Sequence, residues 1–196
     1  MQNNFKNIEF LKQITTHDYE SFLKLPPMIP FSEEITDYLN ALSKEINKDP
    51  RINKFPDVRT FSFFCRKANL LLLKKKYYDS SITKLGRGLV FHIAPSNVPV
   101  NFAFSLMISL LSGNFNIVRV PSKKFEQTEI IVNAINKLAQ VSQYSNISNR
   151  IILVSYDRNS DATKEFSRDC DVRFWLHETN ILNMLLKINI LSSTSN

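Results

Sequence analysis

The sequence has little cysteine, little tryptophan and no long apolar segment. Its 196 residues include two cysteines and one tryptophan. Cys65 and Cys170 are too few for a disulfide framework, which favours a reducing cytoplasm. The longest apolar stretch, residues 98–111, is interrupted by polar residues and is shorter than the ~20 residues that a membrane span needs. Residues 1–10 contain no apolar signal core. We therefore expect a soluble cytoplasmic protein without a membrane span.

Glycine is also scarce, with three in the chain, and several functional motifs are absent. Gly86-Arg87-Gly88 precedes a predicted strand, and no third glycine follows at the spacing of a dinucleotide fingerprint. There is no P-loop, no metal-ligand cluster and no pair of catalytic acids, so we predict no bound metal. His92 lies on a predicted buried strand and is expected to be a core residue. Cys65 and Cys170 are interpreted as structural, because neither has a recognisable base beside it.

The chain is basic, with a net charge of +7 and a pI of about 9.4. This balance favours anionic partners such as nucleotides, coenzyme A, nucleic acid or a membrane surface, although an ordinary basic protein is the simpler interpretation. Lys74-Lys75-Lys76 is expected to be a solvated last turn of a helix, with phosphate binding as the alternative. Nucleic-acid binding rests on charge alone, since no recognition module is present, and we expect no nucleic-acid partner.

Hydrophobic periodicity predicts a helical N-terminal region, residues 1–84, and then an α/β region, residues 85–178. The N-terminal region is expected to contain one helical turn at 8–11 and helices at 33–47 and 58–77, the last capped by Asp57. From residue 85 onward strands and helices alternate. The predicted strands are 88–93, 117–120, 151–155 and 172–175. One predicted helix ends at Gly113, a second covers 124–140 with Ser122 as its cap, and a third covers 160–168. A polar loop is expected at 141–149. The alternation implies a Rossmann-like parallel sheet, whose strand order is not readable.

A proline-bounded loop follows the first predicted strand of the α/β region. It reads Pro95-Ser96-Asn97-Val98-Pro99. Two prolines end the strand and stiffen the loop. The loop lies at a strand's carboxyl end, where open α/β sheets bind their ligands. Asn97 therefore has two equal interpretations: an amide donor for a developing oxyanion in acyl chemistry, or a side chain that closes a turn on its own backbone.

The stretch from Gly88 to Lys123 resembles the fatty acyl-CoA reductases of the LuxC family, in the aldehyde dehydrogenase superfamily. Pro95-x-Asn97-x-Pro99 is similar to the superfamily motif Pro-x-Asn-x-Pro, and Cys170 to Arg173 continues the match. The resemblance implies an α/β fold of the aldehyde dehydrogenase type. It also implies reduction of a fatty acyl-CoA, or another acyl thioester, to the aldehyde with NADPH, after an enzyme cysteine has taken the acyl group.

The resemblance also implies the site residues. Asn97 would be the oxyanion-hole amide and thus the catalytic residue. The residues expected near the nicotinamide side of the cofactor are Ile93, Ala94, Pro95 and Ser96. Those expected at the adenosine ribose are Arg119, Pro121, Ser122 and Lys123. A cation at Lys123 would suit a 2′-phosphate. Ordinary surface charge is the alternative for Arg119 and Lys123.

The chain departs from the family pattern after Arg173. The family continues with a Gly-Gly turn next to the pyrophosphate, where this chain has Phe174-Trp175-Leu176-His177-Glu178. Residues 179–196 fit no family element, and neither cysteine occupies the position of the family's nucleophile. We therefore expect an incomplete fold, an N-terminal portion without the catalytic cysteine domain that is inactive alone. The alternative is a non-catalytic nucleotide-binding module that acts with a partner chain. Both an oligomer and a complex with other fatty-acid-reductase subunits are compatible with the sequence.

Overall fold

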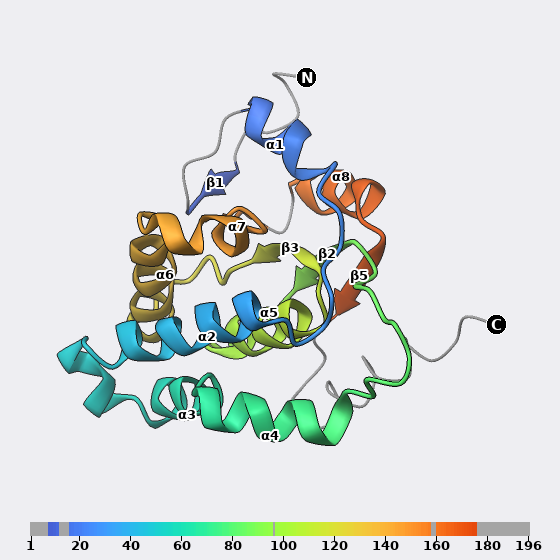
Figure 1. Cartoon of the computed structure of the whole chain (residues 1–196). Coiled ribbons are helices and arrows are strands. Elements are labelled where there is room, and N and C mark those ends of the chain that lie inside the picture. Colours follow the sequence, from blue (N-terminus) through green and yellow to red (C-terminus); the bar gives the residue numbers. More distant parts are fainter. Residues whose placement is uncertain (1–7, 12–15, 96, 158–159, 176–196) are drawn as a thin grey trace.

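A five-stranded sheet forms the centre of the computed structural model, which describes residues 8–11, 16–95, 97–157 and 160–175 (Figure 1). The strands lie in the order β1-β4-β3-β2-β5. Their bounds are Glu9–Phe10 for β1, Leu89–Ile93 for β2, Phe115–Arg119 for β3, Ile151–Ser155 for β4 and Val172–Trp175 for β5. β2 to β5 pair in parallel, and β1 joins the edge of β4 in antiparallel orientation. The prediction of an α/β protein with parallel pairing is confirmed.

The chain changes direction across the sheet next to β2. From β2 it proceeds outward to β3 and β4, and then crosses back so that β5 pairs with the other side of β2. β2 is therefore an interior strand at the point where the order reverses, and all five of its residues are buried. In open α/β sheets the point where the order reverses leaves a crevice at the carboxyl ends of the strands. Here that point lies at the ends of β2 and β5.

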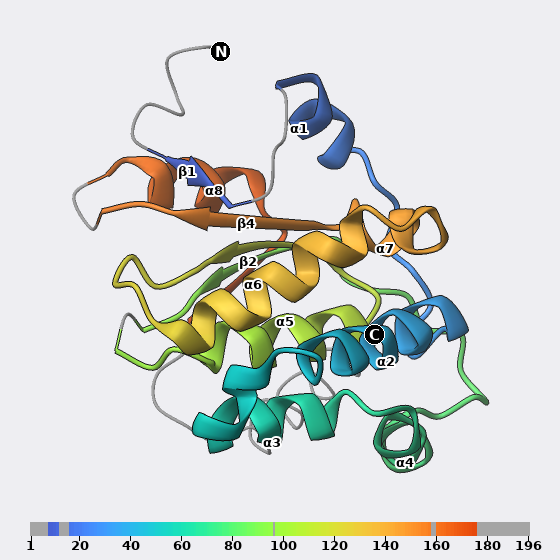
Figure 2. The same ribbon diagram turned by 90° about the vertical axis from the view of Figure 1, so that its left-hand side faces the viewer.

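Helices cover both faces of the sheet. One face packs against α5 (Asn101–Leu111) and α6 (Glu126–Ala139), with α2 (Glu33–Ile46) outside them. The other face packs against α8 (Ala162–Asp169) and α1 (Thr16–Phe22). Figure 2 shows a further layer beyond α2, made of α3 (Pro56–Phe64) and α4 (Lys67–Tyr77). Shorter helical segments are η1 (Pro50–Lys54), η2 (Ser142–Tyr144) and α7 (Ser145–Ser148).

The predicted βαβ unit is present as β2, α5 and β3. α5 is apolar on all sides because it lies between the sheet and α2, and ten of its residues, Phe102 to Leu111, are buried. The helix ends before Gly113, whose φ of 82° is the left-handed conformation that glycine adopts without strain. The Gly113 carbonyl accepts a 2.8 Å hydrogen bond from the Met28 amide. The N-terminal segment is therefore tied to the turn that starts β3.

The single helix predicted at 58–77 is wrong, because the structure has two helices. α3 ends at Phe64, and Arg66 has an extended backbone with ψ of 140° before α4 begins. The Asn69 side chain donates to the Phe64 carbonyl, which satisfies an open helix end. The prediction of Asp57 as the cap is also wrong, since α3 starts at Pro56 after Phe55. Of the run Leu70–Leu73, predicted to be buried, Leu70 is buried, Leu73 is half-buried, and Leu71 and Leu72 are exposed.

Three further local predictions are wrong. Residues 8–11 contain strand β1 instead of a helical turn, because Glu9 and Phe10 pair with the open edge of β4. Residues 141–149 contain η2 and α7 instead of a loop, and Ile147 of α7 is buried. The cap of α6 is Phe125, so Ser122 does not start that helix. Tertiary contacts outweigh local propensity in the first two segments.

No helix within the described residues is long and apolar enough to cross a membrane.

Candidate functional site

The candidate site lies where β2, β3 and β5 end. Ile93 pairs with Arg119 on one side and with Trp175 on the other, so the last residues of three strands lie in one row. The loop after β2 starts with Ala94, which is buried, and Pro95, which is half-buried. The structure thus brings residues 93–95, which are predicted at the nicotinamide side, next to Arg119, the first of the residues predicted at the adenosine ribose. Ser96 lies outside the described residues.

Asn97 is exposed at the tip of the loop. Among the described residues its side chain has no hydrogen-bond partner, so it does not close a turn on its own backbone. The loop is anchored to α6, because the hydroxyl of Thr128 donates a 3.0 Å hydrogen bond to the Pro99 carbonyl. Directly after the loop Val100 caps α5, and its carbonyl accepts from the Ala103 amide at 3.0 Å. An amide on a stiff, anchored loop is a donor that a ligand can use.

The segment after β3 combines buried and exposed residues. Pro121 is buried, whereas Ser122 and Lys123 are exposed. The Lys123 ammonium lies 5.2 Å from the centre of the Phe125 ring, which directs it along the surface at the start of α6. A hydroxyl and an ammonium next to the end of a parallel strand are suitable partners for a ribose or a phosphate group.

Arg119 has a partner that the sequence did not reveal. Its Nη2 donates a 3.1 Å hydrogen bond to the Tyr156 carbonyl, and its guanidinium carbon lies 4.7 Å from the centre of the Tyr156 ring. Tyr156 is buried and follows β4 directly. The rule that ligand sites collect at carboxyl ends of parallel strands could have drawn attention to this residue. Arg119 thus connects the ends of β3 and β4. Of Arg119 and Lys123, the two cations predicted at the adenosine ribose, Lys123 is the more accessible.

A buried polar chain lies behind the site. His92 Nε2 is 3.0 Å from Asn116 Oδ1, and Asn116 Nδ2 donates to the Asn114 carbonyl at 3.1 Å. Since that carboxamide donates through its nitrogen, its oxygen accepts, and His92 carries its proton on Nε2. His92 Nδ1 is buried without a partner among the described residues. The expectation of a core histidine is confirmed, and sequence reasoning missed its link to Asn116.

Both cysteines lie away from the loop. Cys65 is fully buried at the end of α3, and burial raises the pKa of its thiol well above the ordinary range. Cys170 precedes β5 and therefore lies at the amino edge of the sheet, opposite Asn97. Its Sγ is 3.5 Å from the Ser167 carbonyl, and burial raises its pKa as well. Thiols that stay protonated are poor nucleophiles, which favours the structural interpretation of both cysteines.

The site defines a class of protein: an α/β protein with a parallel sheet, a carboxyl-edge loop that presents an amide, and a cation beside it. Comparison with family models then identifies the family. The model described as acyl-CoA reductase (LuxC) matches residues 10–177, which is most of the 196-residue chain. The chain therefore belongs to the LuxC acyl-CoA reductase family. No curated protein and no solved structure was found to match it.

The buried histidine predicts a pH dependence of stability. Burial lowers the pKa of His92 to about 4, compared with ~6.5 in an unfolded chain. As the pH falls, the unfolded chain binds the proton first, so this contribution to stability is complete above pH ~6.5 and is lost towards pH ~4. Between pH 7 and pH 5 the free energy of unfolding of the wild type should fall by roughly 2 kcal/mol more than that of His92→Gln. Urea denaturation at both pH values measures this; equal pH slopes in the two proteins would contradict it.

Proposed function

We propose that the chain is the nucleotide-binding part of an acyl-CoA reductase that uses NADPH, with the sheet arranged as in the aldehyde dehydrogenase superfamily. The observation that carries this proposal is the row formed by Ile93 and Arg119 beneath an exposed, unpartnered Asn97. Membership of the LuxC family supplies the acyl substrate class. The substrate is then a fatty acyl-CoA or a related acyl thioester, and the product is the aldehyde.

The residues after β3 fit the adenosine end of NADPH. Ser122 and Lys123 are both exposed there, and residues 120–124, Val-Pro-Ser-Lys-Lys, contain no carboxylate that would repel a 2′-phosphate. Residues 93–95 would lie along the nicotinamide side. When bound, the cofactor supplies the hydride. The family's glycine turn beside the pyrophosphate corresponds to residues 176–178, which are outside the described residues.

Asn97 is the residue that we assign to the acyl carbonyl. Its amide would donate to the carbonyl oxygen as negative charge develops on it, and the anchored loop keeps the donor oriented before the reaction. The N-terminus of α5 follows the loop within a few residues and favours negative charge on the same side. These two features orient and stabilise the reacting group, and neither supplies a nucleophile.

The acyl-accepting thiol is not one of the two cysteines of this chain. Cys65 is enclosed in the core, and Cys170 lies at the opposite edge of the sheet, so neither can reach a carbonyl held by Asn97. This observation also favours the alternative of a nucleotide-binding module that works with a partner chain. In both cases the chain binds cofactor and orients the acyl group, and the thiol is contributed from outside these residues.

The assignment of Lys123 is tested with two cofactors. Lys123→Ala should weaken NADPH binding about tenfold and leave NADH binding unchanged, because the ammonium contacts the 2′-phosphate that NADH lacks. Isothermal titration calorimetry measures both affinities, and Lys124→Ala, the neighbouring exposed lysine, is the matched control. Equal losses in the two variants, or an equal loss for NADH, would contradict the assignment. Absence of NADPH binding to the wild type would overturn the cofactor proposal.

The assignment of the cysteines is tested with a long-chain acyl-CoA. The purified chain should form no thioester on Cys65 or Cys170 and should not oxidise NADPH, because both thiols are protonated and far from Asn97. Intact-mass spectrometry and absorbance at the NADPH band measure the two outcomes. Stable acylation of either cysteine, or acyl-dependent oxidation of NADPH, would show that the chain catalyses the reaction by itself.

A further inference from the structure

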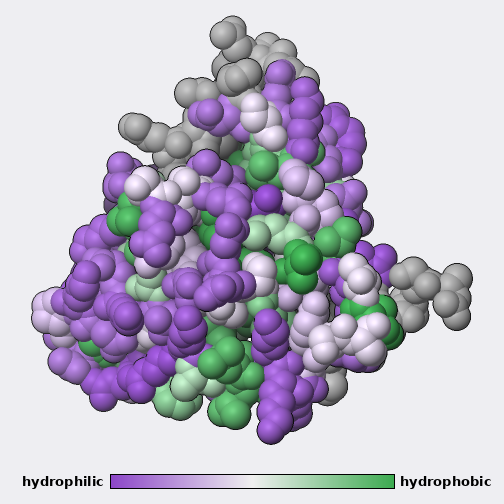
Figure 3. Space-filling view, viewed as in Figure 1, coloured by the Kyte–Doolittle hydropathy of each residue, from purple (hydrophilic) through white to green (hydrophobic). Residues whose placement is uncertain are grey.

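The outer face of α4 is the largest feature that the proposed function leaves unexplained. α4 lies in the layer farthest from the sheet on its side of the molecule (Figure 2). It is attached to the fold through Leu70, which is fully buried, while the next two residues, Leu71 and Leu72, are 52% and 66% exposed. Figure 3 shows the hydrophobic patch over α4 at the lower edge of the molecule. Folding does not require exposed leucines there, so the patch calls for a binding role.

The exposed residues of α4 form one continuous stripe. They are Lys67, Ala68, Leu71, Leu72, Lys75 and Lys76, and this spacing places them on one side of a helix. The leucines lie in the middle, and lysines lie at both ends. Phe63, at the end of α3, is 51% exposed and extends the apolar part, with the guanidinium of Arg66 5.2 Å from the centre of its ring.

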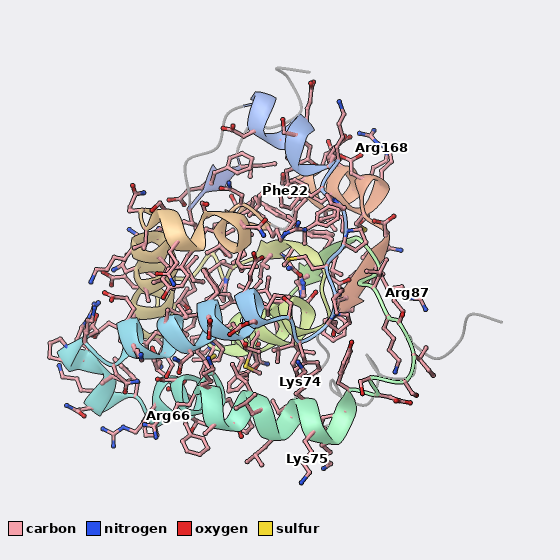
Figure 4. All side chains as sticks on the ribbon, in the orientation of Figure 1. Phe22, Arg66, Lys74, Lys75, Arg87 and Arg168 are labelled. Carbon is pink, nitrogen blue, oxygen red and sulfur yellow. The ribbon has the colours of Figure 1, made fainter. Side chains whose placement is uncertain are left out.

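Within residues 58–78 all the charged side chains have the same sign. Residues 58–78 contain no aspartate or glutamate, and their basic residues are Arg59, Arg66, Lys67, Lys74, Lys75 and Lys76. Three of these make hydrogen bonds or ion pairs with polar groups of the fold: Arg59 donates to the Asn53 side chain, Lys67 pairs with Asp37 at 2.7 Å, and Lys74 donates to the Phe31 carbonyl at 3.1 Å. Figure 4 shows the difference between neighbours, since Lys74 points towards α2 and Lys75 points away from the protein.

We propose that the α3–α4 face binds the surface of an anionic lipid membrane. Its leucines and Phe63 would enter the boundary between headgroups and acyl chains, and Lys75 and Lys76 would contact lipid phosphates. A basic side chain on a long aliphatic stem can serve both regions at once. The helix lies on the surface of the fold with its apolar stripe outward, so the whole domain would rest on the membrane without a spanning segment.

Charge complementarity favours a membrane over a second copy of the chain. A twofold symmetric contact centred on the leucines would bring Lys75 and Lys76 of each copy opposite the basic start of α4, Arg66 and Lys67, of the other copy. Like charges in contact are destabilising, and no acidic residue within 58–78 offsets them. An anionic lipid surface supplies negative charge over the whole stripe and an apolar layer beneath it. The inference does not depend on the assignment of NADPH or of Asn97.

The test is flotation of the full chain with lipid vesicles. The wild type should float with vesicles of phosphatidylcholine containing roughly one third phosphatidylglycerol, and should not float with pure phosphatidylcholine. The double variant Leu71→Ser/Leu72→Ser and the double variant Lys75→Glu/Lys76→Glu should each reduce the bound fraction at least about tenfold. Circular dichroism checks that both stay folded, which the exposure of all four positions leads us to expect.

The matched control moves the same charge change to the other side of the molecule. Lys24 follows α1 and Lys164 lies in α8, and both are exposed at the end opposite α4 (Figure 1). Lys24→Glu/Lys164→Glu should float like the wild type. The proposal fails if the wild type stays unbound, if the leucine variant floats normally, or if the control loses as much binding as Lys75→Glu/Lys76→Glu. Binding to an acidic polypeptide without binding to vesicles would assign the face to a protein partner and also overturn the proposal.

Discussion

Parallel pairing around β2 is the constraint on which the rest of the structure depends. β2 is hydrogen-bonded to β3 on one side and to β5 on the other, so three strands end in one row at Ile93, Arg119 and Trp175. The loop that carries Asn97 leaves from the centre of that row. α5 then returns the chain across the sheet, and the turn at Gly113 starts β3. A one-residue slip in this register would exchange the strand side chains between the two helix-covered faces and disrupt the packing on both, which makes the arrangement of the site a property of the core.

The sequence predicts most of the α/β part because its signals are local. Short apolar runs bounded by proline or glycine, as in Gly88–Ile93, leave few alternatives to a buried strand. The errors arise where distant contacts decide. Glu9 and Phe10 become a strand because β4 offers an open edge, and the predicted 58–77 helix is divided at Cys65–Arg66, where the Asn69 side chain bonds the end of α3 and Leu70 packs into the core. Neither contact is visible in the residues themselves.

The candidate site likewise combines features that local sequence predicts with features that depend on distant contacts. The loop of Asn97 could be predicted, because prolines and strand ends are local features and the family motif covers them. The pairing of Arg119 with Tyr156 could not, since it joins the ends of two strands that are 37 residues apart. The position of Cys170 at the amino edge also depends on the strand order, which periodicity does not encode. The residues proposed for the site are thus readable from the sequence, whereas their positions relative to Cys170 depend on the sheet topology.

We propose that residues 94–100 and 119–123 form one cofactor-binding edge. Hydrogen–deuterium exchange of the full chain with and without NADPH tests this most directly, because it reports on both segments in one experiment. Exchange should become slower in both segments and stay unchanged in α4. Protection of only one segment, or protection confined to another part of the chain, would contradict it.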